Sequence, residues 1–420
     1  MQAIHLAASL LLVLIVNNPV QAADGWPQWR GPTRDGQSVG ERWPSALSAD
    51  HLQSSWRVEL GPSYSGPIVT SDRVFVTETK DRKTEVVRAL HRETGKELWR
   101  TEWPGALSVP FFAKANGDWI RSTPAFDGER LYVAGIRDLL VCLDAKSGAE
   151  LWKVDFVKQF GTPLPAFGCV CSPLVDGKFL YMQAGASLAK IDKMTGKVIW
   201  QALKDGGGTY GSAFSSPVIA TLHGTRQLIV QSRKKLAGVH LEDGQVLWSA
   251  DIPAFRGMNI LTPTVVGNRI FTSSYGGGSF LFAVEKNGAT FSLKKMWKNK
   301  VQGYMSSPVV IGNHVYLHLK NQRFACIDLK TGKEDWITTP FGKYWSMVVR
   351  DNRILALDER GDLLLINATP KKFDLLDQRH ISDSPTWAHL AVVGDEIFIR
   401  ELNAQMVYRW EDKKLNAVLR

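Results

Sequence analysis

The stretch that decides the fold is Asp192-Lys193-Met194-Thr195-Gly196-Lys197-Val198-Ile199-Trp200, a glycine turn followed by a short apolar run that ends in tryptophan. The same pattern, with its glycine four residues before the tryptophan, recurs along the chain and ends at Trp99, Trp152, Trp248 and Trp336, with a looser copy at Trp297. Glycine supplies the positive φ that a tight turn between two strands requires. Each copy therefore predicts a β-hairpin whose second strand carries a large apolar ring.

A second recurring phrase precedes each hairpin. It consists of Ser or Thr close to Pro, a few apolar residues, a turn and an apolar strand, as in Ser172-Pro173 followed by Asp176-Gly177. The whole unit reads strand, turn, strand, loop, strand, turn, strand, and it returns about every 50 residues. One such unit is one four-stranded blade, and no long amphipathic helix pattern competes with it. The sequence therefore predicts an all-β protein, a β-propeller.

Counting the units predicts an eight-bladed propeller. The units begin near Gly66, Ser122, Ser172, Ser216, Thr262, Ser307, Ser346 and Ser384. Upstream lies an unassigned strand, Leu52–Leu60, which carries Trp56 and would complete the last blade and remove the open sheet edges. We therefore expect residues 52–420 to form one propeller of four-stranded blades closed by the N-terminal strand; seven blades with a stray hairpin is the alternative. The docking rings are expected at Trp99, Trp152, Trp200, Trp248, Trp297, Trp336 and Trp410.

The repeat resembles the tryptophan-docking repeat of PQQ-like β-propellers, a fold shared by quinoprotein alcohol dehydrogenases and by envelope assembly factors of the BamB type. The segment from Trp26 to Gly36 (WPQWRGPTRDG) is similar to the N-terminal segment of many secreted bacterial PQQ-like repeat proteins. The resemblance covers nearly the whole mature chain. It implies the propeller fold, and it implies activity only weakly because one fold hosts many functions.

Three departures limit what the resemblance implies. The dehydrogenases are longer and carry adjacent cysteines against the quinone, whereas Val170 separates Cys169 from Cys171 here. No motif matches their calcium ligands or catalytic aspartate, and the lipid-anchoring cysteine of the assembly factors is missing. We therefore predict no cofactor, and PQQ with calcium only under the alternative function given below.

The first residues indicate export. Leu6–Val16 is an apolar run too short to span a bilayer, and a small-residue cleavage pattern ending at Ala22 follows it. We read residues 1–22 as a signal peptide and residues 23–51 as a separate N-terminal segment. The mature chain is expected to be periplasmic or secreted, without a transmembrane helix, and monomeric.

Composition and cysteine usage narrow the class further. The chain has 420 residues, 44% hydrophobic and 22% charged, which excludes a disordered protein, and its formal net charge is +10. Cys142 and Cys326 occupy matching strand positions and are expected to be small buried residues. Cys169 and Cys171 are expected on one face of a strand, where a metal or redox role stays open.

The candidate site follows from the chain path. Middle loops of blades and connections between blades must lie on one face, and the middle loops carry net positive charge, whereas the turns before each tryptophan are net negative. Aromatic connections converge there on the channel mouth. The candidate ligand- or partner-binding residues are Tyr64, Trp119, Arg121, Cys171, Tyr210, Phe214, Arg233, Lys235, Tyr304, Lys343 and Trp345. The competing interpretation is that the lysines are merely solvated and the aromatic rings plug the channel.

No spacing of residues in the sequence indicates a nucleophile, a general base or a metal site. His314 and His318 have the spacing of helical zinc ligands, but in a strand that spacing separates them by about 13 Å. We therefore predict an exported, non-catalytic binding or scaffold module for an envelope protein or an anionic polymer or ligand, without a nucleic-acid partner. The alternative is a small PQQ-dependent quinoprotein dehydrogenase with the cofactor in the central channel.

Overall fold

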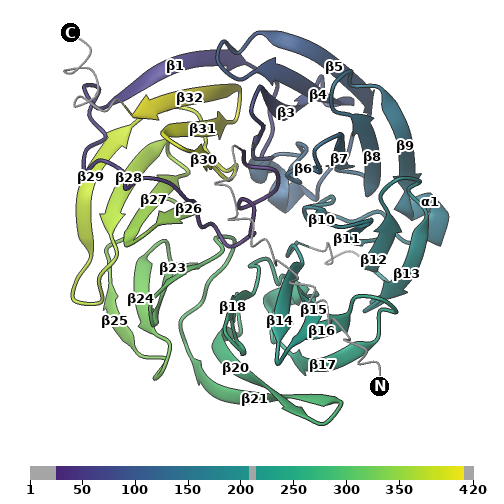
Figure 1. Cartoon of the computed structure of the whole chain (residues 1–420), viewed down its shortest axis with the longest axis vertical. Coiled ribbons are helices and arrows are strands. Elements are labelled where there is room, and N and C mark those ends of the chain that lie inside the picture. Colours follow the sequence, from purple (N-terminus) through teal and green to yellow (C-terminus); the bar gives the residue numbers. More distant parts are fainter. Residues whose placement is uncertain (1–24, 208–213, 411–420) are drawn as a thin grey trace, which may run out of the picture.

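The chain folds into a ring of eight four-stranded antiparallel sheets, which confirms the predicted eight-bladed β-propeller (Figure 1). The computed structural model describes residues 25–207 and 214–410. The predicted signal peptide, residues 1–22, and Tyr210 lie outside these ranges. Within them, no helix has the length and apolar character needed to cross a bilayer.

The first four blades follow one another along the chain, each built from the inner strand at the channel to the outer strand at the rim. Their strands are β2 (Ile68–Val69), β3 (Arg73–Lys80), β4 (Thr84–His91) and β5 (Glu97–Pro104); β6 (Ala125–Phe126), β7 (Arg130–Gly135), β8 (Leu139–Asp144) and β9 (Glu150–Asp155); β10 (Leu174–Asp176), β11 (Phe179–Ala184), β12 (Ser187–Asp192) and β13 (Val198–Ala202); and β14 (Val218–Leu222), β15 (Thr225–Gln231), β16 (Lys235–His240) and β17 (Val246–Asp251).

The next three blades repeat this order, and the eighth takes its outer strand from the start of the chain. Their strands are β18 (Thr264–Val266), β19 (Arg269–Ser274), β20 (Gly278–Asn287) and β21 (Thr290–Asn299); β22 (Val309–Ile311), β23 (His314–His318), β24 (Phe324–Asp328) and β25 (Glu334–Ile337); β26 (Trp345–Arg350), β27 (Arg353–Asp358), β28 (Asp362–Asn367) and β29 (Asp374–His380); and β30 (Ala391–Val393), β31 (Glu396–Glu401), β32 (Ala404–Trp410) and β1 (Leu52–Glu59).

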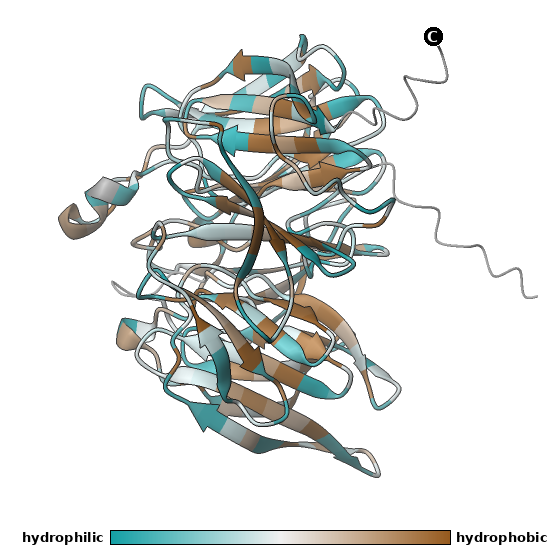
Figure 2. Cartoon of the chain, turned by 90° about the vertical axis from the view of Figure 1, so that its left-hand side faces the viewer, coloured by the Kyte–Doolittle hydropathy of each residue, from teal (hydrophilic) through white to brown (hydrophobic). Residues whose placement is uncertain are grey.

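The core lies between neighbouring blades. In the second strands almost every residue is buried because both sheet faces are covered, whereas outer strands such as β5 alternate between half-buried and exposed residues. One cluster joins Phe75 and Val87 of the first blade to Leu131 and Val133 of the second. Seen from the side, the strands run between two faces that carry the loops (Figure 2).

The ring closes through β1, which pairs with β32 from Leu52 opposite Trp410 to Glu59 opposite Ala404, with one irregularity between Ser54 and Trp56. The last blade is thus completed by the N-terminal strand, as predicted. Closure of this kind leaves no blade with an unfinished sheet, and it ties the two ends of the propeller together.

Most of the repeated tryptophans connect one blade to the next. Trp99 lies against Gly148 of the following blade, and its Nε1 donates a hydrogen bond to the Ala145 carbonyl oxygen at 3.1 Å. The same arrangement joins further ring and glycine pairs, namely Trp56 with Gly95, Trp152 with Gly196, Trp200 with Gly244 and Trp297 with Gly332. The glycine is needed because a β-carbon at Gly148 would lie 2.5 Å from Trp99 Cε3.

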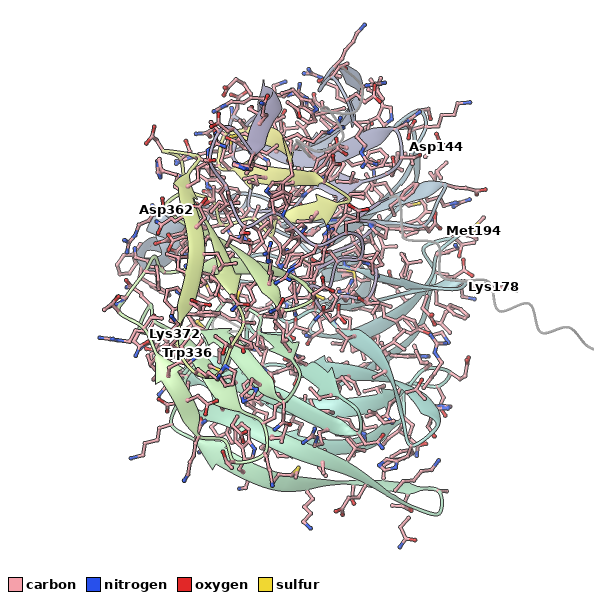
Figure 3. The ribbon with its side chains drawn as sticks, turned by 60° about the vertical axis from the view of Figure 1, so that its left-hand side comes forward. Asp144, Lys178, Met194, Trp336, Asp362 and Lys372 are labelled. Carbon is pink, nitrogen blue, oxygen red and sulfur yellow. The ribbon has the colours of Figure 1, made fainter. Side chains whose placement is uncertain are left out.

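Trp336 uses a different partner in the following blade. Its Nε1 donates to the Thr369 carbonyl oxygen at 2.9 Å, and its ring packs against Phe373 at 5.8 Å between centroids. Trp336 and Lys372 of that turn lie beside each other (Figure 3). A prolyl turn thus replaces the glycine turn at this interface.

Two predicted docking tryptophans do not dock as expected. Trp248 folds back over Gly238 of its own blade, and its Nε1 donates to Gln227 Oε1 at 2.6 Å. The next hairpin, β20–β21, has ten-residue strands, so its turn at Gly288 extends past any neighbouring ring. Trp410 ends a third strand and stacks on Trp43 at 5.7 Å, because β1 supplies the outer strand of that blade.

Candidate functional site

Two opposite faces of the ring carry different loops, because each blade is antiparallel. The loops between second and third strands and the connections between blades lie on one face, here called the connection face; the remaining turns form the turn face. The connections hold the three short helices of the described chain, η1 (Phe111–Asn116), α1 (Phe156–Phe160) and η2 (Phe255–Gly257). Asp144 and Met194, in turns of neighbouring blades, both project from the turn face (Figure 3).

A cavity of about 180 Å³ lies at the centre of the connection face. All eight connections between blades contribute to its wall, and the N-terminal segment contributes its floor. We call this cavity the aromatic cup; its lining residues are Trp29, Tyr64, Asn116, Arg121, Thr123, Phe167, Val170, Ser172, Phe214, Ser216, Met258, Ile260, Thr262, Tyr304, Met305, Ser307, Tyr344, Trp387 and His389.

The floor exists because the N-terminal segment crosses the channel, as the purple trace at the centre of Figure 1 shows. Isolated bridges pair Trp26 with Val69 and Gln37 with Val349, so the segment is fastened to the inner strands of the first and seventh blades. Between these anchors, Trp29 reaches the cup. The central channel is therefore closed beneath the cup by the chain itself.

Two buried arginines fix this floor. Arg30 Nη2 donates to the Pro308 carbonyl oxygen at 2.5 Å, and Arg34 Nη1 donates to the Pro173 carbonyl oxygen at 2.8 Å. These carbonyl groups belong to the steps before β22 and β10, so the two side chains span opposite parts of the ring. The guanidinium carbons lie 5.5 and 5.7 Å from the centre of the Trp29 ring.

The floor is positively charged. Burial lowers the pKa of both Arg30 and Arg34 to about 10, which leaves them charged at neutral pH. Neither forms an ion pair with the described residues, and the Nε of each is buried without a hydrogen-bond acceptor among them. Burial, followed by the nearby Arg30, lowers the pKa of His389 to about 3, so this imidazole is neutral.

The wall of the cup is a series of stacked rings. Tyr64 stacks on Trp387 at 5.2 Å and 23°, and Tyr344 stacks on the same Trp387 at 6.0 Å and 21°. On another side, Phe167 packs against Phe214 at 5.9 Å. Burial raises the pKa of Tyr344 to about 12, so the phenol stays neutral. Flat apolar faces with neutral polar edges suit a flat ligand.

Arg121 adds a third cation, in the wall itself. Its Nε donates to the Trp119 carbonyl oxygen at 3.1 Å and its Nη2 donates to the Gly117 carbonyl oxygen at 3.0 Å. Burial lowers its pKa to about 10, and the nearby Asp118 carboxylate opposes that shift. Trp119 lies behind it, with the Arg82 guanidinium 5.4 Å from the ring centre.

The structure brings four of the predicted site residues together. Tyr64, Arg121, Phe214 and Tyr304 all line the aromatic cup, and Trp119 holds Arg121 from behind through its carbonyl oxygen. The connections between blades were expected to converge on the channel mouth, and in the structure they do so around the cup. Tyr210 lies outside the described residues.

Three predicted basic residues lie elsewhere on the connection face. Lys343 lines a separate shallow hollow, shared with Tyr64. Arg233 lies 3.6 Å from Asp205, and Lys235 forms an ion pair with Asp251 at 2.8 Å. None of these three side chains lines the cup, so they contribute to the charge of the connection face only.

The structure corrects two predicted site residues. Trp345 is fully buried at the start of β26, where its Nε1 donates to Asp358 Oδ2 at 2.9 Å and its ring stacks on His318. Cys171 is also fully buried and faces the blade, where its Sγ accepts a hydrogen bond from the Gln183 backbone nitrogen at 3.2 Å. The neighbouring Val170 reaches the cup instead.

The cysteine pair also differs from expectation. Cys169 and Cys171 lie in the connection before β10, not on a strand, and both are free thiols. Burial raises the pKa of Cys171 to about 11 and that of Cys169 well above its ordinary value, so both are protonated at neutral pH. A protonated, inaccessible thiol is a poor nucleophile and metal ligand.

The residues of the cup do not fit a calcium-bound quinone. Calcium takes six to eight oxygen ligands, with carboxylates prominent among them. Within residues 25–207 and 214–410, no Asp or Glu lines the cup, and no three His, Cys, Asp or Glu side chains are grouped to hold a metal ion. We therefore derive no chemistry through that cofactor.

Sequence reasoning missed the floor and part of the wall. Trp29 and His389 were not candidates, because their place depends on the path of the N-terminal segment and on the last connection. Trp387 was not a candidate either, although it lies outside the docking repeat. The usable signal was the position of Trp387 in the Ser-Pro connection before the eighth blade, which matches the position of Tyr344 before the seventh.

Comparisons of the chain with known proteins identify its relatives. Residues 83–338, more than half of the chain, match the family model described as outer membrane protein assembly factor BamB. Over 380 residues, the chain is 24% identical to the outer membrane protein assembly factor BamB of Moranella endobia, covering 84% of this chain and 89% of that protein.

Solved structures agree on the fold. BamB from Moraxella catarrhalis superposes with a TM-score of 0.62 at 13% identity, covering 86% of this chain and 98% of that one. A quinohemoprotein alcohol dehydrogenase from Pseudomonas putida superposes with a TM-score of 0.61 at 14% identity, covering 92% of this chain and 80% of that one. At such identities these likenesses show the propeller fold and nothing about activity.

Proposed function

Because this chain belongs to the family of the outer membrane protein assembly factor BamB, we propose that it is an exported, non-catalytic β-propeller that binds a protein of the cell envelope through its connection face. Export is supported by the apolar run Leu6–Val16 and the small residues after it. The proposed location is the periplasm or the medium outside the cell.

The observation that carries this proposal is the convergence of all eight connections around a cup whose channel the chain itself has closed. Such a closed surface is suited to binding. Exposed apolar side chains lie on the same face: Phe111 is 83% exposed and Phe112 is 54% exposed, both on η1. Large exposed rings grouped on one surface loop are typical of partner contacts.

Charge supports a partner with an acidic surface. Lys80, Arg82 and Lys83 occupy the first middle loop, and Lys234 and Lys235 occupy the fourth, whereas Asp144 and Asp192 lie in turns on the opposite face. Complementary charge at the rim of an interface raises association rates more than it raises affinity. We propose that the basic middle loops steer an acidic partner to the connection face.

Site-specific photo-crosslinking in cells tests the proposal. A photoreactive amino acid in place of Phe112 probes the connection face, and the same residue in place of Met194, which is 50% exposed, probes the turn face. We expect a defined adduct from position 112 alone, and mass spectrometry identifies the captured protein. Affinity purification through that captured protein should recover the same adduct. Equal adducts from both positions would contradict the proposal.

A charge variant sharpens the test. Lys83→Glu on the connection face is expected to lower the adduct yield several-fold at low salt, while Lys178→Glu on the turn face leaves it unchanged. Both lysines are exposed, and Lys178 lies on the same side of the molecule as Met194 (Figure 3). An unchanged adduct yield in both variants would contradict the proposed electrostatic steering.

A quinone-dependent dehydrogenase is the second candidate, because a quinohemoprotein alcohol dehydrogenase shares this propeller fold. No carboxylate is found among the described residues that line the cup, which argues against this candidate. Purified protein mixed with PQQ and calcium is expected to show no thermal shift, no change in quinone absorbance and no dye reduction with alcohols. Dye reduction dependent on both additions would replace the binding proposal.

A further inference from the structure

Among the residues that the structure describes, cations surround the aromatic cup and no anionic side chain lines it. Arg121 lies in its wall, and Arg30 and Arg34 lie against the ring of Trp29 that forms its floor. None of the three forms an ion pair among the described residues, and no acidic side chain lines the cavity. A buried site with uncompensated positive charge favours an anion, because the anion replaces the missing counter-charge.

One donor of the wall is free to bind that anion. Arg121 uses Nε and Nη2 on two backbone carbonyl groups, which fixes the guanidinium plane. Its Nη1 has no hydrogen-bond acceptor among the residues of the described chain. A guanidinium held in this way presents a preoriented donor to a carboxylate, and little side-chain entropy is lost when the bond forms.

The rest of the cup selects a flat apolar body. Tyr64, Trp387 and Tyr344 stack face to face along one wall, and Phe167 and Phe214 close another. Their polar edges are neutral phenols and an indole. An aromatic ring inserted among them would bury its faces on other rings, where offset stacking adds to the gain from area burial.

Size limits the ligand to one ring with a short acidic arm. A cavity of roughly 150 Å³ accommodates one benzene ring in other proteins, and the cup measures about 180 Å³. Because Trp29 closes the channel below, the ligand must enter from the connection face and cannot pass through. A polymer chain or a large fused ring system would protrude from the cup.

We infer that the aromatic cup binds the carboxylate of a small aromatic acid, with Arg121 Nη1 donating to the carboxylate and the ring lying against Trp387. The inference rests on the proposed binding function of the connection face and names a ligand class for its centre. The same chemistry occurs in a free aromatic acid and in a protein C-terminus that ends in an aromatic residue.

Calorimetric titration of the full mature protein, with calcium chelated, tests the inference. The probes are 3-phenylpropionate and its neutral amide, and a pentapeptide ending in Phe with either a free or an amidated carboxyl group. We expect each acid to bind at least tenfold more tightly than its amide. Binding of the small acid alone identifies a free ligand, binding of the peptide acid alone identifies a protein C-terminus, and either supports the inference.

Variants assign the contact. Arg121→Gln is expected to weaken acid binding at least tenfold and leave amide binding unchanged, and Arg121→Lys restores part of the loss. Retained amide binding shows that the cup is intact in these variants. Arg226→Gln is the matched control, since Arg226 lies at the start of β15 on the turn face and is paired with Asp176 at 2.7 Å, away from the cup. It is expected to bind like the wild type.

Two results would overturn the inference. One is equal affinity for acids and amides, or no binding of any probe; the other is an Arg121→Gln variant that binds the acid as tightly as the wild type. Neither result touches the crosslinking of position 112, which reports on the connection face as a whole. Failure of the cup as an acid site and failure of the face as a protein-binding surface are therefore separate outcomes.

Discussion

Substituting Gly148 with alanine isolates what tryptophan docking contributes to stability. Gly148 has a φ of 77°, and an added β-carbon would lie 2.5 Å from Cε3 of Trp99. Gly177 is the matched control, because its φ is 55° and nothing lies within 4 Å of its added β-carbon. Both substitutions place alanine in a left-handed turn of the same kind of blade, and only one displaces a ring.

The expected cost follows from these contacts. A left-handed conformation costs alanine about 1–2 kcal/mol at either position. At Gly148 the Trp99 ring must also move, which weakens its hydrogen bond to Ala145 (3.1 Å), worth about 1 kcal/mol. The moved ring also loses part of its packing, on the order of 1 kcal/mol. We therefore expect Gly148→Ala to cost about 3–4 kcal/mol and Gly177→Ala about 1–2 kcal/mol.

Urea unfolding followed by near-ultraviolet circular dichroism measures the difference through the transition midpoint. A double variant with Trp99→Leu provides the internal check, because the penalty of alanine at 148 should fall toward that at 177 once the large ring is gone. The reasoning is refuted if Gly148→Ala and Gly177→Ala shift the midpoint equally, or if the Trp99→Leu background leaves the difference between them intact.

The remaining predictions concern a buried carboxyl group and the closing strand. Burial raises the pKa of Glu85 to about 7 against the opposing hydrogen bonds from Ile136 and Trp103, so its contribution to stability is complete below about pH 4.5 and is lost as the pH rises through 7. The unfolding free energy of the wild type should therefore fall between pH 5 and pH 8, and in Glu85→Gln this fall should be smaller by about 2 kcal/mol. Urea unfolding at pH 5 and pH 8 measures both falls. An equal fall in the two proteins would contradict the raised pKa of Glu85. Trp56→Ala should lower the unfolding free energy by about 3 kcal/mol in the same assay, because Trp56 Nε1 donates to the Arg92 carbonyl oxygen at 2.7 Å between the last blade and the first. A loss below about 1 kcal/mol would show that closure of the propeller does not depend on the Trp56 side chain.

The fold was predictable because its determinants are local and repeated. A glycine four residues before a tryptophan specifies a turn and a docking ring within a single hairpin, and the chain repeats that hairpin. The strand Leu52–Glu59 could be assigned to the last blade because it had no partner of its own and a closed ring requires one. Neither inference depends on long-range detail.

Trp248 and Trp410, whose docking was predicted wrongly, show the limit of prediction from local sequence. Trp248 follows the same local pattern as Trp200, yet the hairpin after it is longer and presents no turn at the docking position. Its actual partner, Gly238, sits in β16 of the same blade, where only a residue without a β-carbon leaves room for the ring. A glycine in the interior of a strand was the signal available in the sequence.

The candidate site was predictable in outline for the same topological reason. Connections between blades must converge, so Tyr64, Arg121, Phe214 and Tyr304 could be placed together without any contact being known. Trp345 was misassigned because one residue along a strand reverses the direction of a side chain: Tyr344 lines the cup, and Trp345 is buried within the blade.

The charge of the aromatic cup follows from a structural need unrelated to ligands. Eight short inner strands surround the channel, and each presents an edge whose carbonyl and amide groups lack a neighbouring strand. The N-terminal segment satisfies several of these groups, through its bridge to Val69, the Arg30 bond to Pro308 and the Arg34 bond to Pro173. Arginine suits this task because it offers five donors and needs only acceptors. Since the acceptors are neutral carbonyl groups and no described carboxylate forms an ion pair with Arg30 or Arg34, the positive charge against the Trp29 ring has no directly paired anion. Closing the channel with arginines on carbonyl groups thus produces, at the centre of the connection face, the field that favours an anion.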